Sequence, residues 1–183
     1  MGTSIVESSA NTSSLKVPLE EWVKEAQRGE RQAFEQLVRQ TEGLARKTAF
    51  PLLPPHLVDD AVQESYLVVF QKLGHLRDPQ AFQAWLCRIV LHVCYAMQKK
   101  NPMTAELEDK AVEADHSEQL ATQMVLREAL AQISEEARNV LILREFLGLD
   151  YEEIAFALNL PLGTVRSRLH YGRKKLAKVL ENG

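Results

Sequence analysis

Apolar residues recur every three or four positions along most of the first hundred residues, and no stretch there alternates as a strand would. This spacing predicts four amphipathic helices, over residues 19–29, 34–48, 58–73 and 81–100. Prolines at positions 51, 54 and 55 end the second helix, because proline cannot continue a helix. We expect Phe70 in the third helix, and Phe82 and Trp85 in the fourth, to face the core.

Two further helices joined by a tight turn are predicted over residues 151–175. Apolar residues at helical intervals give the first of them one buried face: Ile154, Ala155 and Leu158. Asn159 stands at the turn, where it tolerates a left-handed backbone better than most residues. Pro161 suits the first turn of the helix that follows.

The second of these helices has a buried face and a basic face. Its buried face consists of Val165, Leu169, Gly172, Leu176 and Val179. From Thr164 to Leu180 it carries six lysines or arginines and no acidic residue. In a helix-turn-helix, residues near the start of the second helix reach base edges and later cations reach phosphates. The pattern therefore predicts DNA binding, whereas the basic stretch alone is equally typical of a solvated helix face.

Acidic residues are concentrated between the two helical parts. Residues 101–125 contain six acidic residues and one lysine, although the whole chain has a net charge of only -3. Residues 101–117 open with Asn-Pro and contain few large apolar residues, so we expect a flexible acidic linker there. Residues 1–17 are rich in Ser and Thr and are expected to be a disordered tail. The predicted fold is all-α, with two small helical domains at 18–100 and 118–183.

Composition excludes several classes of protein. With 183 residues, 45% of them hydrophobic and 26% charged, the chain is typical of a globular protein of one or two small domains. No apolar run approaches the length of a membrane span and no basic segment precedes an apolar core, so we expect a cytoplasmic location. No phosphate-binding glycine loop, nucleophile motif or metal-ligand cluster is present, which argues against an enzyme and against a cofactor or metal.

The two cysteines, Cys87 and Cys94, lie seven residues apart in a predicted helix. Two helical turns separate them by about 10 Å, which is too far for a disulfide. We favour the interpretation that both thiols pack as buried apolar groups. The alternatives are a redox switch and a zinc site that also uses His92, although the spacing of these residues matches no usual set of zinc ligands.

Three segments together resemble the bacterial sigma-70 family of RNA polymerase subunits, specifically its small extracytoplasmic-function (ECF) group. They are DDAVQESYLVVFQKL (59–73), AFQAWLCRIVLHV (81–93) and ISEEARNVLILREFLGLDYEEIAFALNLPLGTVRSRL (133–169). The resemblance covers roughly residues 20–180 in the order and spacing of the family's regions 2 and 4. It implies a promoter-specificity subunit that has no chemistry of its own, with a region 2 bundle and a region 4 helix-turn-helix.

The resemblance also implies partners. The family's region 2 binds the clamp helices of the largest polymerase subunit, and region 4 binds the flap of the second-largest. The matching clamp-binding positions are Asp59, Asp60, Gln63 and Glu64. Without the resemblance, these residues are most simply a solvated helix face. Many relatives are also held inactive by an anti-sigma factor, so that partner is a further expectation.

Contacts to the melted minus-ten strand are implied for the fourth helix and the loop before it. The candidate residues are Arg77, Arg88, His92, Lys99 and Lys100. Single-stranded DNA requires such a cationic track together with pockets for unstacked bases. The chain departs from the family where His92 replaces an Asn, Ala96 an Asp and Lys99 an Arg.

Contacts to duplex DNA at the minus-35 element are implied for the basic helix. The candidate residues are Arg166, Ser167, Arg168, His170, Tyr171, Arg173, Lys174 and Lys175. Tyr171 replaces an arginine of well-known relatives, and a tyrosine cannot make the bidentate bond of arginine to guanine. We therefore expect a different base preference.

The alternative function is a stand-alone regulator. Its helix-turn-helix would bind DNA without polymerase, and its N-terminal helices would sense a signal or form a dimer.

Overall fold

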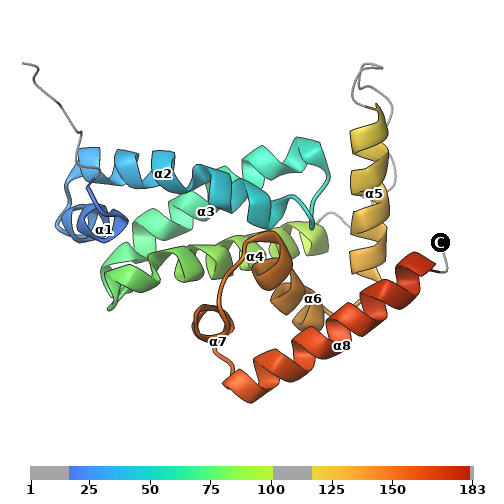
Figure 1. The fold of residues 1–183 in the computed structure, drawn as a ribbon. Coiled ribbons are helices and arrows are strands. Elements are labelled where there is room, and N and C mark those ends of the chain that lie inside the picture. Colours follow the sequence, from blue (N-terminus) through green and yellow to red (C-terminus); the bar gives the residue numbers. More distant parts are fainter. Residues whose placement is uncertain (1–16, 101–116, 182–183) are drawn as a thin grey trace, which may run out of the picture.

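A computed structural model describes residues 17–100 and 117–181, with only the backbone described from 117 to 120. The tail predicted over 1–17 and the linker predicted over 101–117 therefore lie, apart from one terminal residue each, outside the described residues. The described chain contains helices and no strand (Figure 1). The eight α-helices are α1 (Leu19–Gln27), α2 (Arg31–Ala49), α3 (Pro55–Lys72), α4 (Phe82–Lys100), α5 (Ser117–Ala131), α6 (Glu135–Leu141), α7 (Tyr151–Leu158) and α8 (Leu162–Glu181). The all-α prediction is confirmed.

The helices α1 to α4 form the first bundle, as the apolar spacing predicts. Their contacts pair α1 with α2 and place α4 against both α2 and α3. Buried hydroxyl groups inside the bundle are paired: the Tyr66 hydroxyl lies 2.8 Å from Thr41 Oγ1, which itself donates to the Leu37 carbonyl. Short 3-10 turns, η1 (Leu73–His75) and η2 (Pro79–Ala81), connect α3 to α4.

One expectation for this bundle is wrong. Phe70 does not face the core but is 70% exposed, because α3 is apolar on more of its circumference than its neighbours cover. Phe82 is fully buried and Trp85 is half-buried against the core, with the two ring centroids 6.1 Å apart.

The second bundle is built from α5 to α8 and a π-helical turn, η3 (Ile142–Phe146). The helix α7 begins with a capping box, in which the Asp150 carboxylate accepts from the Glu153 amide at 2.7 Å and the Glu153 carboxylate accepts from the Asp150 amide at 2.8 Å. It ends at Asn159 with φ of 53°, the left-handed turn that the sequence predicts. These two caps fix the angle at which α8 leaves the turn.

In α8, Val165, Leu169 and Gly172 are buried, as predicted, and Leu176 and Val179 are half-buried. At Gly172 the helix approaches α6 so closely that an added Cβ would lie 2.9 Å from Cγ and Cδ1 of Leu141. Glycine at this position is therefore required by packing.

The two bundles contact each other mainly through α4, with a smaller contact between α2 and η3. Figure 1 shows α6 and α7 lying beside α4, and the contacts between α4 and α7 join the two apolar cores into one cluster. A cross-bundle hydrogen bond runs from the Tyr95 hydroxyl of α4 to Oδ1 of Asn139 in α6, at 2.6 Å.

Candidate DNA and partner interfaces

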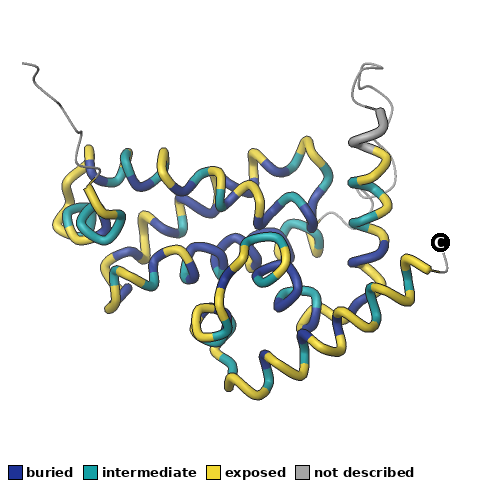
Figure 2. Tube along the Cα trace, viewed as in Figure 1, coloured by how far each residue is buried: buried dark blue, intermediate teal, exposed yellow. Residues whose placement is uncertain are grey.

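The basic face predicted on the last helix is solvent-accessible. Most of its candidate residues are exposed and two, Arg168 and Lys175, are half-buried; the exposed ones are Arg166, Ser167, His170, Tyr171, Arg173 and Lys174. Figure 2 shows exposed residues along the whole of α8, which forms one edge of the molecule. Because α6 and α7 pack against the opposite side of α8, the orientation of the basic face is fixed.

One of these cations already has a partner. Arg173 donates from Nε and Nη2 to Oε1 of Glu145 in η3, at 2.8 and 2.6 Å. Both side chains are about half exposed, at 53% and 42%, so the pair is screened by water. The ion pair orients the guanidinium and offsets part of its charge.

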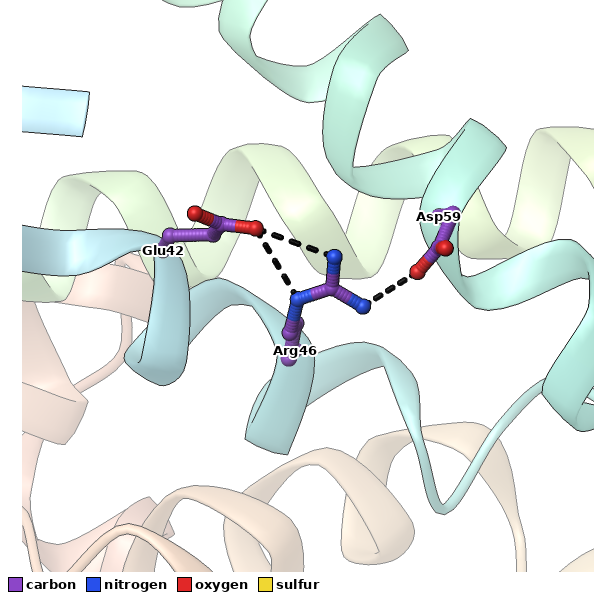
Figure 3. A network of polar contacts seen from close by, with 3 residues as sticks. All are labelled: Glu42, Arg46 and Asp59. Carbon is purple, nitrogen blue, oxygen red and sulfur yellow. Dashed lines mark hydrogen bonds and ion pairs between the residues drawn. The ribbon is translucent and has the colours of Figure 1, made fainter. Parts of the chain in front are cut away.

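The acidic candidates on α3 are exposed, and one of them belongs to a charge network. Figure 3 shows Arg46 of α2 between two carboxylates, Glu42 and Asp59. Its guanidinium donates to Glu42 at 2.9 Å and also to Asp59, and these bonds raise the pKa of Arg46 above its usual value. Asp60, next to Asp59 in α3, is also exposed.

Two apolar residues that the sequence interpretation missed extend this surface. Leu67 and Phe70 are 64% and 70% exposed, and they follow Asp59 and Gln63 on one stripe of α3 at intervals of four, four and three residues. Their spacing alone could not have identified them, because α3 is apolar around much of its circumference. We call these four residues the α3 stripe.

The α3 stripe borders a groove. The groove has a volume of about 900 Å³, lies between α1, α2 and α3, and is lined partly by Gln63, Leu67 and Phe70. Phe34 of α2 also lines it and meets Phe70 edge-to-face, with ring centroids 5.3 Å apart. An exposed apolar surface rimmed by polar residues is typical of a protein-binding site.

The minus-ten candidates lie on α4 and on the loop before it. Arg88, His92 and Lys99 fall on one side of α4, where Arg88 is half-buried and the others are exposed. Arg77 is exposed in the loop between η1 and η2, and Lys100 is exposed at the end of α4. We call Arg88, His92 and Lys99 the α4 stripe.

The surroundings of His92 favour the neutral form of its imidazole. Its partial burial lowers its pKa, and Arg88 and Lys72 add to this shift, while Glu135 of α6 opposes it. The α4 stripe therefore carries its positive charge on Arg88 and Lys99, and His92 offers a hydrogen bond.

The cysteines lie in the interior of the molecule. Both are buried, and burial raises the pKa of Cys87 to about 11 and that of Cys94 to about 12. Thr48 donates to the sulfur of Cys87 at 3.6 Å. Within the described ranges, no three His, Cys, Asp or Glu side chains come together as metal ligands would. Thiols in such surroundings are protonated and unreactive.

Over residues 17–100 and 117–181, no helix is both long and apolar enough to span a bilayer.

Comparisons with known proteins identify both bundles. The family models described as "Sigma-70 region 2" and "Sigma-70, region 4" match residues 33–101 and 123–176. The RNA polymerase sigma-H factor of Pseudomonas aeruginosa is 30% identical over 180 residues, which cover 87% of this chain and 92% of that protein. The ECF RNA polymerase sigma-E factor of Salmonella typhimurium is 31% identical over 173 residues, or 84% of this chain and 90% of that protein.

Solved structures agree with this match. CnrH in complex with the cytosolic domain of CnrY superimposes with a TM-score of 0.72 at 25% identity, over 90% of this chain and 97% of that one. The sigma factor RpoE of Bartonella quintana, solved with the anti-sigma factor NepR, shares the fold with a TM-score of 0.63 at 24% identity, over 81% and 96%. Both regions are present in the family's order, and the chain therefore belongs to the sigma-70 family, in its extracytoplasmic-function group.

Proposed function

We propose that this chain is a promoter-specificity subunit whose exposed surfaces have separate tasks. The α3 stripe with its neighbouring carboxylates binds polymerase, the α4 stripe with Arg77 and Lys100 holds the melted minus-ten strand, and α8 reads the minus-35 element. The observation that carries the proposal is the presence of both family regions in one chain. Each region alone binds its promoter element weakly. Holding both regions on one polymerase raises their effective concentration at a promoter that has both elements.

The minus-35 reading rests on the position and chemistry of α8. Arg166, Ser167 and His170 are exposed in its first half, where a recognition helix contacts base edges. Tyr171 is 53% exposed and offers one hydroxyl and an apolar ring, which suits a thymine methyl better than a guanine. The later cations contact phosphates.

The polymerase surface combines charge with apolar area. Asp59, Asp60 and Glu64 supply negative charge that attracts a basic partner during encounter. Leu67 and Phe70 supply the apolar anchors that usually dominate binding energy once the partners dock. We assign the clamp helices of the largest polymerase subunit to this surface, and the flap of the second-largest subunit to region 4.

An anti-sigma factor is a second partner of the same surfaces. The solved relatives CnrH and RpoE are each bound to another protein, named as an anti-sigma factor in the case of NepR. The chain has no catalytic task in this scheme. It acts where polymerase and chromosome are, in the cytoplasm.

Run-off transcription with core polymerase tests the proposal. The wild-type chain should initiate at discrete promoters on genomic fragments and co-elute with core in gel filtration. Phe70→Asp should abolish co-elution, whereas Arg166→Ala should preserve it and lose initiation at minus-35-dependent promoters. Glu128→Gln, an exposed position on α5, is the matched control. Specific binding to duplex DNA without core, and no co-elution with core, would instead identify a stand-alone regulator.

A further inference from the structure

The loop between α3 and α4, residues 73–81, is tied to α1 by one side chain. Gln27, the last residue of α1, donates from Nε2 to the Leu73 carbonyl at 3.0 Å and to the Leu76 carbonyl at 2.7 Å. The helix α1 also contacts both short turns of the loop, η1 and η2. The two bonds span 46 and 49 positions of the sequence, so they fix the loop against a distant part of the bundle.

The second of these bonds reaches the peptide group next to Arg77. The Leu76 carbonyl belongs to the peptide bond that joins Leu76 to Arg77, so Gln27 holds the backbone directly before the candidate cation. Leu73 and Leu76 are buried, whereas Arg77 is exposed. The loop therefore has two buried anchors and one cation that points outward from them.

The part of the loop after Arg77 is shaped by local bonds. The Asp78 carboxylate accepts from the Gln80 amide at 3.0 Å, and the Asp78 carbonyl accepts from the Ala81 amide at 3.1 Å. Pro79 restricts the backbone further. Such local bonds define the turn but not its place against the bundle. That place depends on the buried leucines and on Gln27.

Both donors of the Gln27 amide are used on the loop, and they lie in partly buried surroundings. Without them, the two carbonyls would have to turn toward water or stay unpaired, and an unpaired partly buried carbonyl costs free energy. Either outcome loosens the backbone that carries Arg77. Ordering a loose loop at the moment of binding lowers affinity, a cost that a preformed loop avoids.

We propose that Gln27 is a positioning residue for the minus-ten strand, which holds the loop in the shape that lets Arg77 bind. The inference rests on the proposed function, since that function assigns Arg77 to this strand. Gln27 acts through the loop backbone and does not itself touch DNA. Loss of its two bonds should therefore weaken the contact that Arg77 makes and leave the contacts of the α4 stripe unchanged.

Strand binding by holoenzyme tests the inference. The probe is the single-stranded non-template DNA of a promoter that the wild-type holoenzyme transcribes. Gln27→Leu removes both donors at similar side-chain size and should weaken binding of this strand about tenfold, the effect of two net hydrogen bonds. Gln27 also lines the groove beside the α3 stripe, so each holoenzyme is formed first with saturating core. A change in core affinity then does not enter the result.

Gln98→Leu is the matched control. Gln98 of α4 also donates from Nε2 to a carbonyl, that of Leu52 at 2.6 Å, in partly buried surroundings and across 46 positions of the sequence. Its acceptor lies between α2 and α3, away from the 73–81 loop. This variant should lower the melting temperature but change strand affinity less than twofold.

A double-mutant cycle provides a readout that a purely structural role would not move. Arg77→Ala should weaken strand binding about fivefold in the wild-type background, the effect of one hydrogen bond to a charged group. In the Gln27→Leu background the same change should cost less than twofold, because Arg77 is already misplaced. Arg88→Ala, on α4 and outside the loop, should cost the same in both backgrounds.

The outcomes separate this inference from the proposed function. The inference is overturned if Gln27→Leu weakens strand binding no more than Gln98→Leu, or if Arg77→Ala has equal effects in both backgrounds. If Gln27→Leu does not fold, Gln27→Glu enters the same cycle, since it keeps the side-chain shape and its carboxylate has no donor at pH 8. If the wild type binds no core and transcribes no promoter, the proposed function itself fails.

Discussion

Gly172 lets α8 approach α6 closely because it has no side chain. A Cβ at this residue would lie 2.9 Å from Leu141 and 3.3 Å from the Ala137 carbonyl oxygen, so Gly172→Ala should destabilise region 4 by about 1–3 kcal/mol through overpacking. Gly163→Ala, in the same helix with nothing within 4 Å, should be neutral or stabilising by up to about 1 kcal/mol. Urea unfolding of both variants measures the difference, and equal stabilities would refute the packing requirement.

Tyr66 predicts a pH dependence of stability. Burial raises its pKa from 10.0 to about 12, so its stabilising contribution is complete below pH 10 and is lost as the pH rises toward 12. Tyr66→Phe removes this titration and one hydrogen bond, which costs about 1 kcal/mol at pH 8. The advantage of the wild type in urea unfolding should then shrink by up to about 1.4 kcal/mol per pH unit above pH 10. A difference that stays constant up to pH 11.5 would contradict the shift.

For single residues, the sequence predicted roles in turns and helix packing better than it predicted which side chains are exposed. Asn159 and Gly172 were identified correctly because turn geometry and helix packing restrict the residue types allowed. Pro161 was expected in the first turn of α8 but directly precedes the helix, which begins at Leu162. Phe70 was misassigned because an apolar side chain at a helical interval looks the same whether a neighbour covers it or a partner does. Which residues contact DNA or polymerase stays a prediction.

Among the elements, α7 depends on its N-terminal cap. Asp150→Ala removes the carboxylate that accepts from the Glu153 amide, one half of the capping box, and should cost about 1 kcal/mol of region 4 stability. Ser134→Ala is the matched control, because Ser134 precedes α6 without a capping hydrogen bond from its side chain. Thermal unfolding should separate the two variants. Equal losses of stability in the two variants would show that the capping box does not stabilise α7.

Substitutions on the basic face of α8 should change the salt dependence of DNA affinity to different extents. Lys174→Ala removes an exposed cation and should lower the slope of log affinity against log salt by about 1. Arg173→Ala should lower it less, because Glu145 already offsets part of that charge. Titrations of holoenzyme with promoter duplex at several salt concentrations measure both slopes. A larger effect from Arg173 would mean that the ion pair breaks on binding.

Helix positions were predictable because the apolar spacing extends through whole elements, from α1 to α4 and through α7 and α8. The π-helical turn η3 was not predictable, since it contacts α2, α6 and α7 and apolar spacing does not show such contacts. The apolar part of the α3 stripe was missed for a related reason. The helix α3 is apolar around much of its circumference, so periodicity could not identify the uncovered side.

For the whole molecule, thiol reactivity should report separation of the helices packed around α4. With a pKa of about 11 at Cys87 and about 12 at Cys94, little thiolate exists near pH 8. Labelling by a disulfide reagent should be at least about a hundredfold slower than for a free cysteine, and urea should accelerate it in parallel with unfolding. Rapid labelling of the native chain would mean that α4 opens readily.

The presence of two bundles could be read from the sequence, but their contact could not. The apolar periodicity and the charge distribution divide the sequence into two helical parts. Neither pattern shows that α4 has more apolar surface than the other helices of its own bundle cover. The Tyr95–Asn139 bond joins residues 44 positions apart, and such a pair has no local signature.

The bridge that Arg46 makes between Glu42 and Asp59 bears on how the chain leaves polymerase. If Asp59 meets a cation of the partner, docking exchanges one ion pair for another instead of creating a new one. Such an exchange changes the net free energy little in either direction. When the complex dissociates, the Asp59 carboxylate can pair with Arg46 again. A surface built in this way favours turnover: the factor can be released after one round of initiation and used again.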